Sequence, residues 1–245
     1  MTHPLGNEAH PLDNPVRSSL LAGHARFAER HGAALRYPPG VVPFAALPGR
    51  PGPADWADLA ALAGPGTTVA LVGMREPVPD GWGATLIGEG VQMVYGGASD
   101  ALAEDVVRLG AADVPEMLDL TARTRPGPFL ARTHELGRYL GIRRNGALVA
   151  MAGERLKPAG WTEISAVCTD PAWRGHGFAG RLIQILAASI QARGDTPFLH
   201  AVASNSGAIR LYEALGFRTR QETVFRRIHV PAEQASDQRA APLAD

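Results

Sequence analysis

The stretch Thr169-Asp-Pro-Ala-Trp-Arg-Gly-His-Gly-Phe-Ala-Gly-Arg-Leu182 joins an apolar extended segment to a long amphipathic helix through a loop of small residues. Such a loop leaves several backbone N–H groups at the start of the helix unpaired and directed at one place. These donors and the helix dipole together favour negative charge there. We therefore expect this loop to bind a phosphorylated ligand.

The same loop also satisfies a dinucleotide-binding fingerprint, Gly175-x-Gly177-x-x-Gly180. That fingerprint needs a strand, an immediate turn, a helix and an acidic residue about 20 positions on. Asp195 stands at that separation, but it precedes the next apolar run instead of ending it. A linker at 170–174 also separates the strand from the first glycine. The context therefore disfavours a dinucleotide.

Two motifs carry a resemblance to a known family. Arg174-x-x-Gly177-x-Ala179 resembles the pyrophosphate loop of the GNAT superfamily of acyl-CoA-dependent N-acyltransferases, where the pattern is Gln/Arg-x-x-Gly-x-Gly/Ala. Small residues there let the diphosphate of coenzyme A approach the main chain. Residues 205–217 match a second motif of this superfamily, Asn-x-x-Ala-x-x-Leu-Tyr-Glu-x-x-Gly-Phe. For the loop alone, a strand–loop–helix connection that binds nothing stays an alternative.

The resemblance implies a catalytic domain over residues 105–230 with a mixed α/β sheet and helices on both faces. Apolar periodicity predicts helices around 113–122, 182–190 and 205–216, and a hairpin turn at Asn145-Gly146. Strands are expected at 106–109, 138–143, 147–152, 163–170, 197–202, 217–220 and 223–228. In this family the two central strands splay apart, and the pantetheine of the cofactor lies between them.

Residues 1–104 are rich in glycine, proline and alanine, yet too apolar to be disordered. Their pattern predicts an accessory α/β region with a helix at 56–62 and strands at 67–72, 86–87 and 91–95. The region resembles the N-terminal part of the glycine-N-acyltransferase-like branch, where a degenerate, cofactor-free half packs against the catalytic half. The alternative is an extension that covers one sheet edge. Residues 231–245 lack periodicity and are expected to form a mobile tail.

Composition limits the classes of function. Lys plus Arg and Asp plus Glu both number 24, so no overall field selects nucleic acid or an anionic membrane. One cysteine permits no internal disulfide. No signal peptide and no apolar run of the ~18 residues that span a bilayer is present in the sequence. We expect a soluble cytoplasmic protein without nucleic-acid or membrane partners, of unknown oligomeric state.

The transfer of an acyl group to an amine needs a base for the amine, donors for the oxyanion and an acid for the leaving thiolate. By its matching place in the resembling branch, Glu163 is the candidate catalytic base. Tyr212 is the candidate acid, because the matching tyrosine lies near the cofactor sulfur in many relatives. A solvated carboxylate at a strand end and a packed aromatic ring are the structural alternatives.

The resemblance places the cofactor on the main chain after Glu163, on the loop and on the helix that follows. Val167 N–H is the candidate oxyanion donor, and Asn205 either contacts pantetheine or simply caps its helix. The full set expected to bind the cofactor is Val167, Cys168, Thr169, Arg174, Gly175, His176, Gly177, Phe178, Ala179 and Asn205.

Two further alternatives concern cysteine and histidine side chains. A covalent acyl-cysteine at Cys168 is disfavoured, because a cysteine in a buried strand is more often a small core residue. His176 and His200 have no second ligand at metal-binding spacing on the same element, so we expect no metal.

The sequence therefore predicts an N-acetyltransferase that moves the acetyl group of acetyl-CoA, or of another acyl-CoA, to a primary amine in a ternary complex. A catalytically silent acyl-CoA-binding regulatory module is the alternative. The acceptor, a small-molecule or peptide amine, is expected at the 122–137 loop, with the N-terminal half as a second candidate region. There Arg123, Arg125 or Arg132 can hold a carboxylate, unless these arginines are merely solvated.

Overall fold

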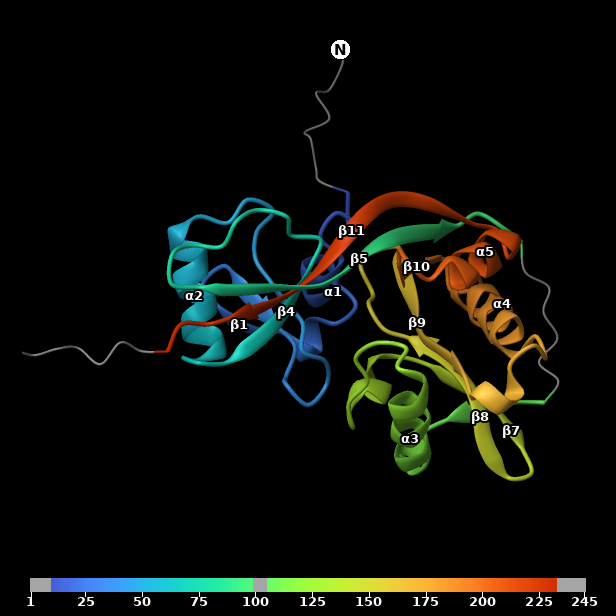
Figure 1. Ribbon diagram of the computed structural model, residues 1–245. Helices are drawn as coiled ribbons and strands as arrows, with labels where there is room; N and C mark the ends of the chain where they lie inside the picture. The colour runs from blue at the N-terminus through green and yellow to red at the C-terminus, as the bar shows by residue number, and fades with distance from the viewer. Residues whose placement is uncertain (1–9, 99–104, 233–245) are drawn as a thin grey trace, which may run out of the picture.

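The computed structural model describes residues 10–98 and 105–232, and in these ranges eight strands form one mixed sheet in the order β4-β11-β5-β10-β9-β8-β7-β6 (Figure 1). The strands are β4 (Thr68–Val72), β5 (Gly83–Tyr95), β6 (Val106–Leu109), β7 (Tyr139–Arg144), β8 (Ala147–Glu154), β9 (Trp161–Thr169), β10 (Thr196–Val202) and β11 (Phe217–His229). Within this sheet β9 and β10 run parallel, and the other neighbouring pairs are antiparallel. The expected mixed α/β class is confirmed.

The two central strands pair over a short distance and then diverge. The pairing of β9 with β10 ends at Phe198 opposite Glu163, although β9 continues to Thr169 and β10 to Val202. Near the far end of β9 the register with β8 shifts, and Ala166 has a φ of +52°. This irregularity is a β-bulge, and it bends β9 because a bulge places an extra residue in the strand that contains it. The splay that the family resemblance implies is therefore present.

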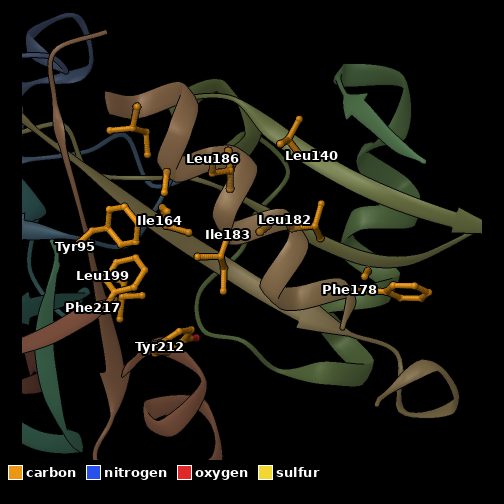
Figure 2. Close-up of a cluster of buried hydrophobic side chains, with 14 of the residues drawn as sticks. Tyr95, Leu140, Ile164, Phe178, Leu182, Ile183, Leu186, Leu199, Tyr212 and Phe217 are labelled. Carbon is orange, nitrogen blue, oxygen red and sulfur yellow. The ribbon is translucent and has the colours of Figure 1, made fainter. Parts of the chain in front are cut away.

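Helices cover both faces of the sheet. On one face lie α4 (Phe178–Gln191) and α5 (Ser206–Ala214), and on the other lies α3 (Val114–Thr124). The predicted apolar spacing of α4 is confirmed: Leu182, Ile183, Leu186 and Ile190 are fully buried against the sheet (Figure 2). The short 3-10 helices are η1 (Ala25–Phe27), η2 (Ala111–Asp113), η3 (Thr133–Leu136) and η4 (Pro171–Trp173).

The N-terminal region has a small core of its own that continues onto the main sheet. It contains α1 (Pro15–Leu21), α2 (Pro53–Ala63) and a small sheet of β1 (Glu29–His31), β2 (Ala34–Arg36) and β3 (Ala45–Ala46). Tyr37 and Phe44 pack in one cluster with Phe198 of β10. Because Leu199 faces the α4 side, alternation along β10 puts Phe198, and with it this region, on the opposite face.

One strand of the N-terminal region belongs to the interior of the main sheet. β5 pairs with β10 on one side and with β11 on the other. The short strands expected at 86–87 and 91–95 are thus one strand of 13 residues. The two closing strands expected at 217–220 and 223–228 are also wrong, because β11 is continuous over 13 residues. Register shifts within the β5–β11 pair interrupt the alternation that a sequence pattern relies on.

The predicted hairpin turn and the predicted end of the last helix are both present. The hairpin turn between β7 and β8 has left-handed conformations at Asn145 and Gly146, and Gly216 ends α5 with a φ of +99°. The domain boundary expected at residue 104 would assign β5 to the N-terminal region, although β5 lies inside the main sheet. Most of the expected tail, 233–245, lies outside the described residues. In the described ranges no helix has both the length and the apolar character needed to cross a membrane.

The position of β5 predicts a stability effect. Met93 is fully buried in the cluster beneath α4, whereas Leu86 on the same strand is 56% exposed. We expect Met93→Ala to lower the free energy of unfolding by about 2–5 kcal/mol, because the truncation leaves a cavity. Leu86→Ala is the control and should change it by less than about 0.5 kcal/mol. Chemical denaturation measures both; equal effects would contradict the place of β5 in the core.

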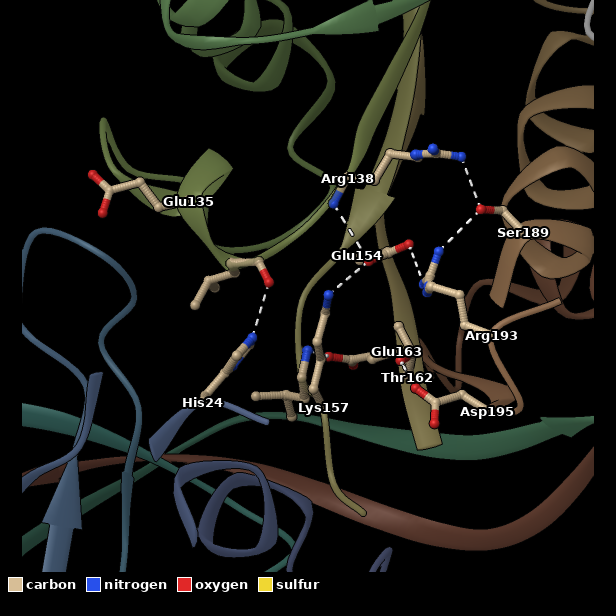
Figure 3. A network of polar contacts seen from close by, with 12 residues as sticks. His24, Glu135, Arg138, Glu154, Lys157, Thr162, Glu163, Ser189, Arg193 and Asp195 are labelled. Atoms are coloured by element: carbon tan, nitrogen blue, oxygen red, sulfur yellow. Dashed lines mark hydrogen bonds and ion pairs between the residues drawn. The ribbon is translucent and has the colours of Figure 1, made fainter. Parts of the chain in front are cut away.

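His24 connects the N-terminal region to the C-terminal half of the chain. Its Nε2 donates to the carbonyl of Leu136 at 2.9 Å (Figure 3), and its Nδ1 lies 2.9 Å from the Tyr37 hydroxyl. Ser19 Oγ accepts from the Lys157 N–H at 2.7 Å and lies 3.1 Å from His24 Nδ1. Burial lowers the pKa of His24 to about 4. The imidazole is therefore neutral in the folded protein.

This pKa gives stability a pH dependence of known sign. The unfolded histidine titrates near 6.5, so between about pH 6.5 and 4 the unfolded state binds the extra proton. The contribution of His24 is complete above pH 6.5 and falls by up to about 3 kcal/mol as the pH drops to 4. His24→Gln keeps an amide donor but cannot titrate, so its unfolding free energy should decline less steeply over this interval. Identical slopes for both proteins would rule the effect out.

Candidate active site

A cavity of about 250 Å³ opens where β9 and β10 diverge. Its walls come from β9, β10, α5, the loop after α3 and the N-terminal region. The lining residues are Phe44, Ala70, Leu71, Val72, Ile87, Arg125, Pro126, Gly127, Pro128, Arg155, Val167, His200, Ala201, Val202, Asn205, Ala208, Tyr212 and Phe225. Among the residues expected from sequence, Val167, Asn205 and Tyr212 thus meet at one cavity.

Tyr212 presents a protonated hydroxyl to this cavity. It lies on α5, packs against Phe217 in the cluster of Figure 2, and is 9% exposed. Its hydroxyl makes no hydrogen bond within the described residues, and burial raises the pKa of Tyr212 to about 12. Tyr212 is therefore protonated at neutral pH, and its hydroxyl is free to donate a hydrogen bond.

Glu163 is a buried, paired carboxylate and not a solvated one at a strand end. The side chain is 0% exposed, and Arg155 binds it through two hydrogen bonds of 2.7 and 2.8 Å. The Leu156 N–H lies 3.3 Å from the same carboxylate. Burial alone would raise the pKa of Glu163, but the charge and hydrogen bonds of Arg155 outweigh it, and the pKa lies well below its usual value. Glu163 is consequently an ionised, fully engaged group.

His200 connects this carboxylate to the cavity. Glu163 does not line the cavity, whereas His200 does, and His200 Nδ1 lies 2.7 Å from Glu163 Oε1. The Gln92 amide nitrogen lies 3.2 Å from His200 Nε2 and 2.9 Å from the Leu12 carbonyl oxygen. Because an amide nitrogen only donates, this network assigns the proton to Nδ1 and leaves Nε2 as the acceptor. No local sequence pattern links His200 to Glu163, 37 positions earlier, so this contact was not predicted.

The main chain of β9 at the cavity departs from regular pairing. Val167 and Ala166 have no partner in the β8 register, which passes from Cys168 opposite Met151 to Ser165 opposite Gly153. On the opposite edge β10 stops pairing at Glu163, so this part of β9 has no partner strand on the side of the cavity, where an oxyanion donor is needed. Cys168 instead packs beneath α3, and burial raises the pKa of its thiol to about 11. The thiol therefore stays protonated at neutral pH, which makes it a poor nucleophile.

The glycine loop has the geometry of an anion site at a helix N-terminus. Gly175 and Gly177 have φ values of +83° and +73°, and α4 begins immediately after Gly177. Within the described residues, the N–H groups of Gly177, Phe178 and Ala179 have no acceptor. Such unpaired donors at the start of a 14-residue helix suit a phosphate group. Within residues 10–98 and 105–232, the side chains of Arg174 and Arg181 make no ion pair.

The side chains of the remaining candidates each have a hydrogen-bond partner. Asn205 caps α5 through its Oδ1, which accepts from the Ala208 N–H at 3.1 Å, and it also lines the cavity. The His176 imidazole lies 3.1 Å from the carbonyl oxygens of Trp173 and Arg174 in the exposed loop. Asp195 accepts from the Thr162 hydroxyl at 2.7 Å and is engaged at the base of β9 (Figure 3). Over residues 10–98 and 105–232, no three His, Cys, Asp or Glu side chains gather as metal ligands would.

The buried ion pair predicts the outcome of a substitution at Glu163. Glu163→Gln leaves the Arg155 guanidinium buried without a counter-charge, so we expect the free energy of unfolding to fall by about 3–5 kcal/mol. Arg155→Met combined with Glu163→Leu removes both charges and should recover most of that loss. Chemical denaturation of the single and double variants measures the difference. A single variant as stable as the wild type would contradict the ion pair.

Comparisons with known proteins agree on one family. The family model of the FR47-like protein matches residues 139–226. An N-alpha-acetyltransferase RimI from Mycobacterium tuberculosis is 35% identical over 38% of this chain, and the match spans 62% of that relative. The ribosomal protein bS18-alanine N-acetyltransferase of Escherichia coli is 30% identical over 50% of this chain and 84% of its own length.

Solved structures extend the likeness to the N-terminal region. A GNAT-family acetyltransferase structure from Novosphingobium aromaticivorans is 40% identical, covers 90% of this chain and 98% of its own, and has a TM-score of 0.82. A GCN5-related N-acetyltransferase from Kribbella flavida covers 90% of this chain and 96% of its own with a TM-score of 0.55; at 20% identity it supports the fold alone. These relatives give no support to the glycine-N-acyltransferase-like branch.

Proposed function

Since this chain belongs to the GNAT family of N-acetyltransferases, we propose that it transfers the acetyl group of acetyl-CoA to a primary amine by direct attack in a ternary complex. The observation that carries the proposal is the divergence of β9 and β10 at Glu163. It opens a cavity on which an unpaired stretch of β9, a histidine bound to a buried carboxylate, and a free tyrosine hydroxyl converge.

The cofactor fits the two ends of this site. The unpaired N–H groups of Gly177, Phe178 and Ala179 would hold the diphosphate, and Arg174 and Arg181 are free to add positive charge. The pantetheine would pair with the β9 edge at 167–169, where β10 has moved away. Gly175, His176 and Asn205 complete the contacts that we propose for the cofactor. The acyl chain length stays open beyond the short acetyl group.

We assign the base to His200. Its Nε2 accepts a proton from the attacking amine, while the ionised carboxylate of Glu163 stabilises the imidazolium that forms through Nδ1. Gln92, which donates to Nε2 at rest, must yield that position to the amine. Glu163 therefore acts as a positioning residue, and the proton-accepting role expected of it passes to its hydrogen-bond partner.

The remaining steps balance atoms and charges. The amine nitrogen forms a bond to the thioester carbon, and the Val167 N–H donates to the oxygen that becomes negative. The carbon–sulfur bond then breaks, and Tyr212 gives its hydroxyl proton to the departing thiolate. The products are an N-acetylated amine and free coenzyme A. His200 returns its proton, and Tyr212 regains one, through exchange with water.

The test uses release of the coenzyme A thiol with a panel of primary amines. His200→Gln should lower kcat/KM about 10²–10⁴-fold, because the general base is lost. The affinity for acetyl-CoA, measured by calorimetry, should stay unchanged. His229→Gln is the matched control, because His229 is exposed and does not line the cavity. Full activity in His200→Gln would overturn the assignment of the base.

A further outcome concerns the whole proposal. If the wild-type protein binds acetyl-CoA but transfers acetyl to no amine in the panel, the chain acts as a silent acyl-CoA-binding module and the proposed reaction fails. If it binds no acyl-CoA, the glycine loop is a structural connection.

A further inference from the structure

The charged groups around the cavity share one sign. Arg125 and Arg155 line it, and no aspartate or glutamate is among its described lining residues. Like charges near a binding site disfavour a positively charged ligand. A polyamine or another polycationic acceptor would therefore meet no counter-charge here. A lone amine, in contrast, is pushed toward its neutral form, which is the nucleophilic one.

One of these basic groups has no partner. The charge of Arg155 is met by the bidentate carboxylate of Glu163. The other two arginines of the 122–137 loop that could hold a carboxylate are also paired. Arg123 forms ion pairs with Asp119 and Asp170. Arg132 forms one with Glu135. Arg125 makes no ion pair in the described ranges. It is thus the free cation at the cavity.

The backbone holds Arg125 in a specific place. Its φ is +51°, in the left-handed region that a residue with a Cβ rarely adopts, and its N–H donates to the Thr121 carbonyl at 2.8 Å. Pro126 follows it and fixes the next backbone angle. Arg125 is the C-cap of α3, a position at which helices commonly end in the left-handed conformation. The guanidinium is therefore presented from a constrained turn.

The rest of the acceptor side of the cavity is apolar and small. Phe44, Leu71, Val72 and Phe225 line it, together with Ile87, which is 53% exposed and lies at a register shift of β5. At about 250 Å³ the cavity is smaller than the ~300–1,000 Å³ typical of pockets for drug-sized ligands. Part of that space belongs to the thioester end of the cofactor. An acceptor inside it must be small and mostly apolar.

We propose that the acceptor is an apolar α-amino acid, or a similarly small amine, whose carboxylate pairs with Arg125 while its amine faces His200. The proposal rests on the proposed function, because it names the acceptor of the same site. A guanidinium binds a carboxylate through two parallel hydrogen bonds, so Arg125 sets specificity as well as affinity. A peptide N-terminus carries an amide where the amino acid carries its carboxylate, and lacks this contact.

The experiment compares L-leucine with L-leucinamide as acceptors for acetyl-CoA, with thiol release as the readout. We expect kcat/KM for leucine to exceed that for leucinamide about 10–100-fold, the effect of a hydrogen bond between charged groups. The amide has the less basic amine, so amine ionisation opposes this preference and cannot produce it. Arg125→Gln should abolish the preference by slowing leucine alone. Arg132→Gln is the control, because its charge is paired with Glu135 and it does not line the cavity.

Different results would overturn the carboxylate subsite and the acetyltransferase activity on which it rests. Equal use of leucine and leucinamide, equal slowing of both by Arg125→Gln, or preference for a peptide N-terminus would overturn the carboxylate subsite while the acetyltransferase stands. Acetyl-CoA binding without turnover of any amine would instead overturn the proposed function. Faster turnover of spermidine than of leucine would contradict the charge argument.

Discussion

The structure depends on the point at which two parallel strands stop pairing. β9 and β10 separate after Glu163 and Phe198, and the carboxylate at that point is fully buried. A buried charge must be paired, so Arg155 and His200 are fixed around it. The gap beyond exposes the end of β9 to a ligand. One ion pair thus holds the fork of the sheet and orients the histidine that we propose as the base.

The N-terminal region has two roles around this fork. Through β5 it completes the sheet between β10 and β11, and through Phe44, Leu71 and Val72 it walls the acceptor side of the cavity. The matches to the M. tuberculosis and E. coli relatives cover half of this chain or less. The acceptor named for those proteins therefore says little about a cavity whose wall includes residues 44 and 70–72.

Local patterns predicted the parts of the site that depend on local sequence. The apolar spacing of α4, the Asn145-Gly146 turn, the cap at Asn205 and the glycine loop each follow from neighbouring residues. The place of β5 did not follow, because it pairs with strands more than 100 positions away and its bulges break the alternation. The contact of Glu163 with His200 joins residues 37 positions apart and needs the register of β9 and β10. Arg155 lies eight positions before Glu163, across a turn at 158–160. A predicted hairpin at this turn would have placed the two side chains close together.

The central claim is that acyl-CoA lies in the fork and on the glycine loop at once. Amide hydrogen exchange with and without saturating acetyl-CoA tests it most directly. The account predicts slower exchange in two separate segments, 166–169 on β9 and 176–180 at the start of α4. A ligand in the fork would cover the edge of β9 that β10 leaves, and its phosphate groups would accept from the unpaired N–H groups of the loop. Protection confined to other segments, or none at saturation, would contradict it.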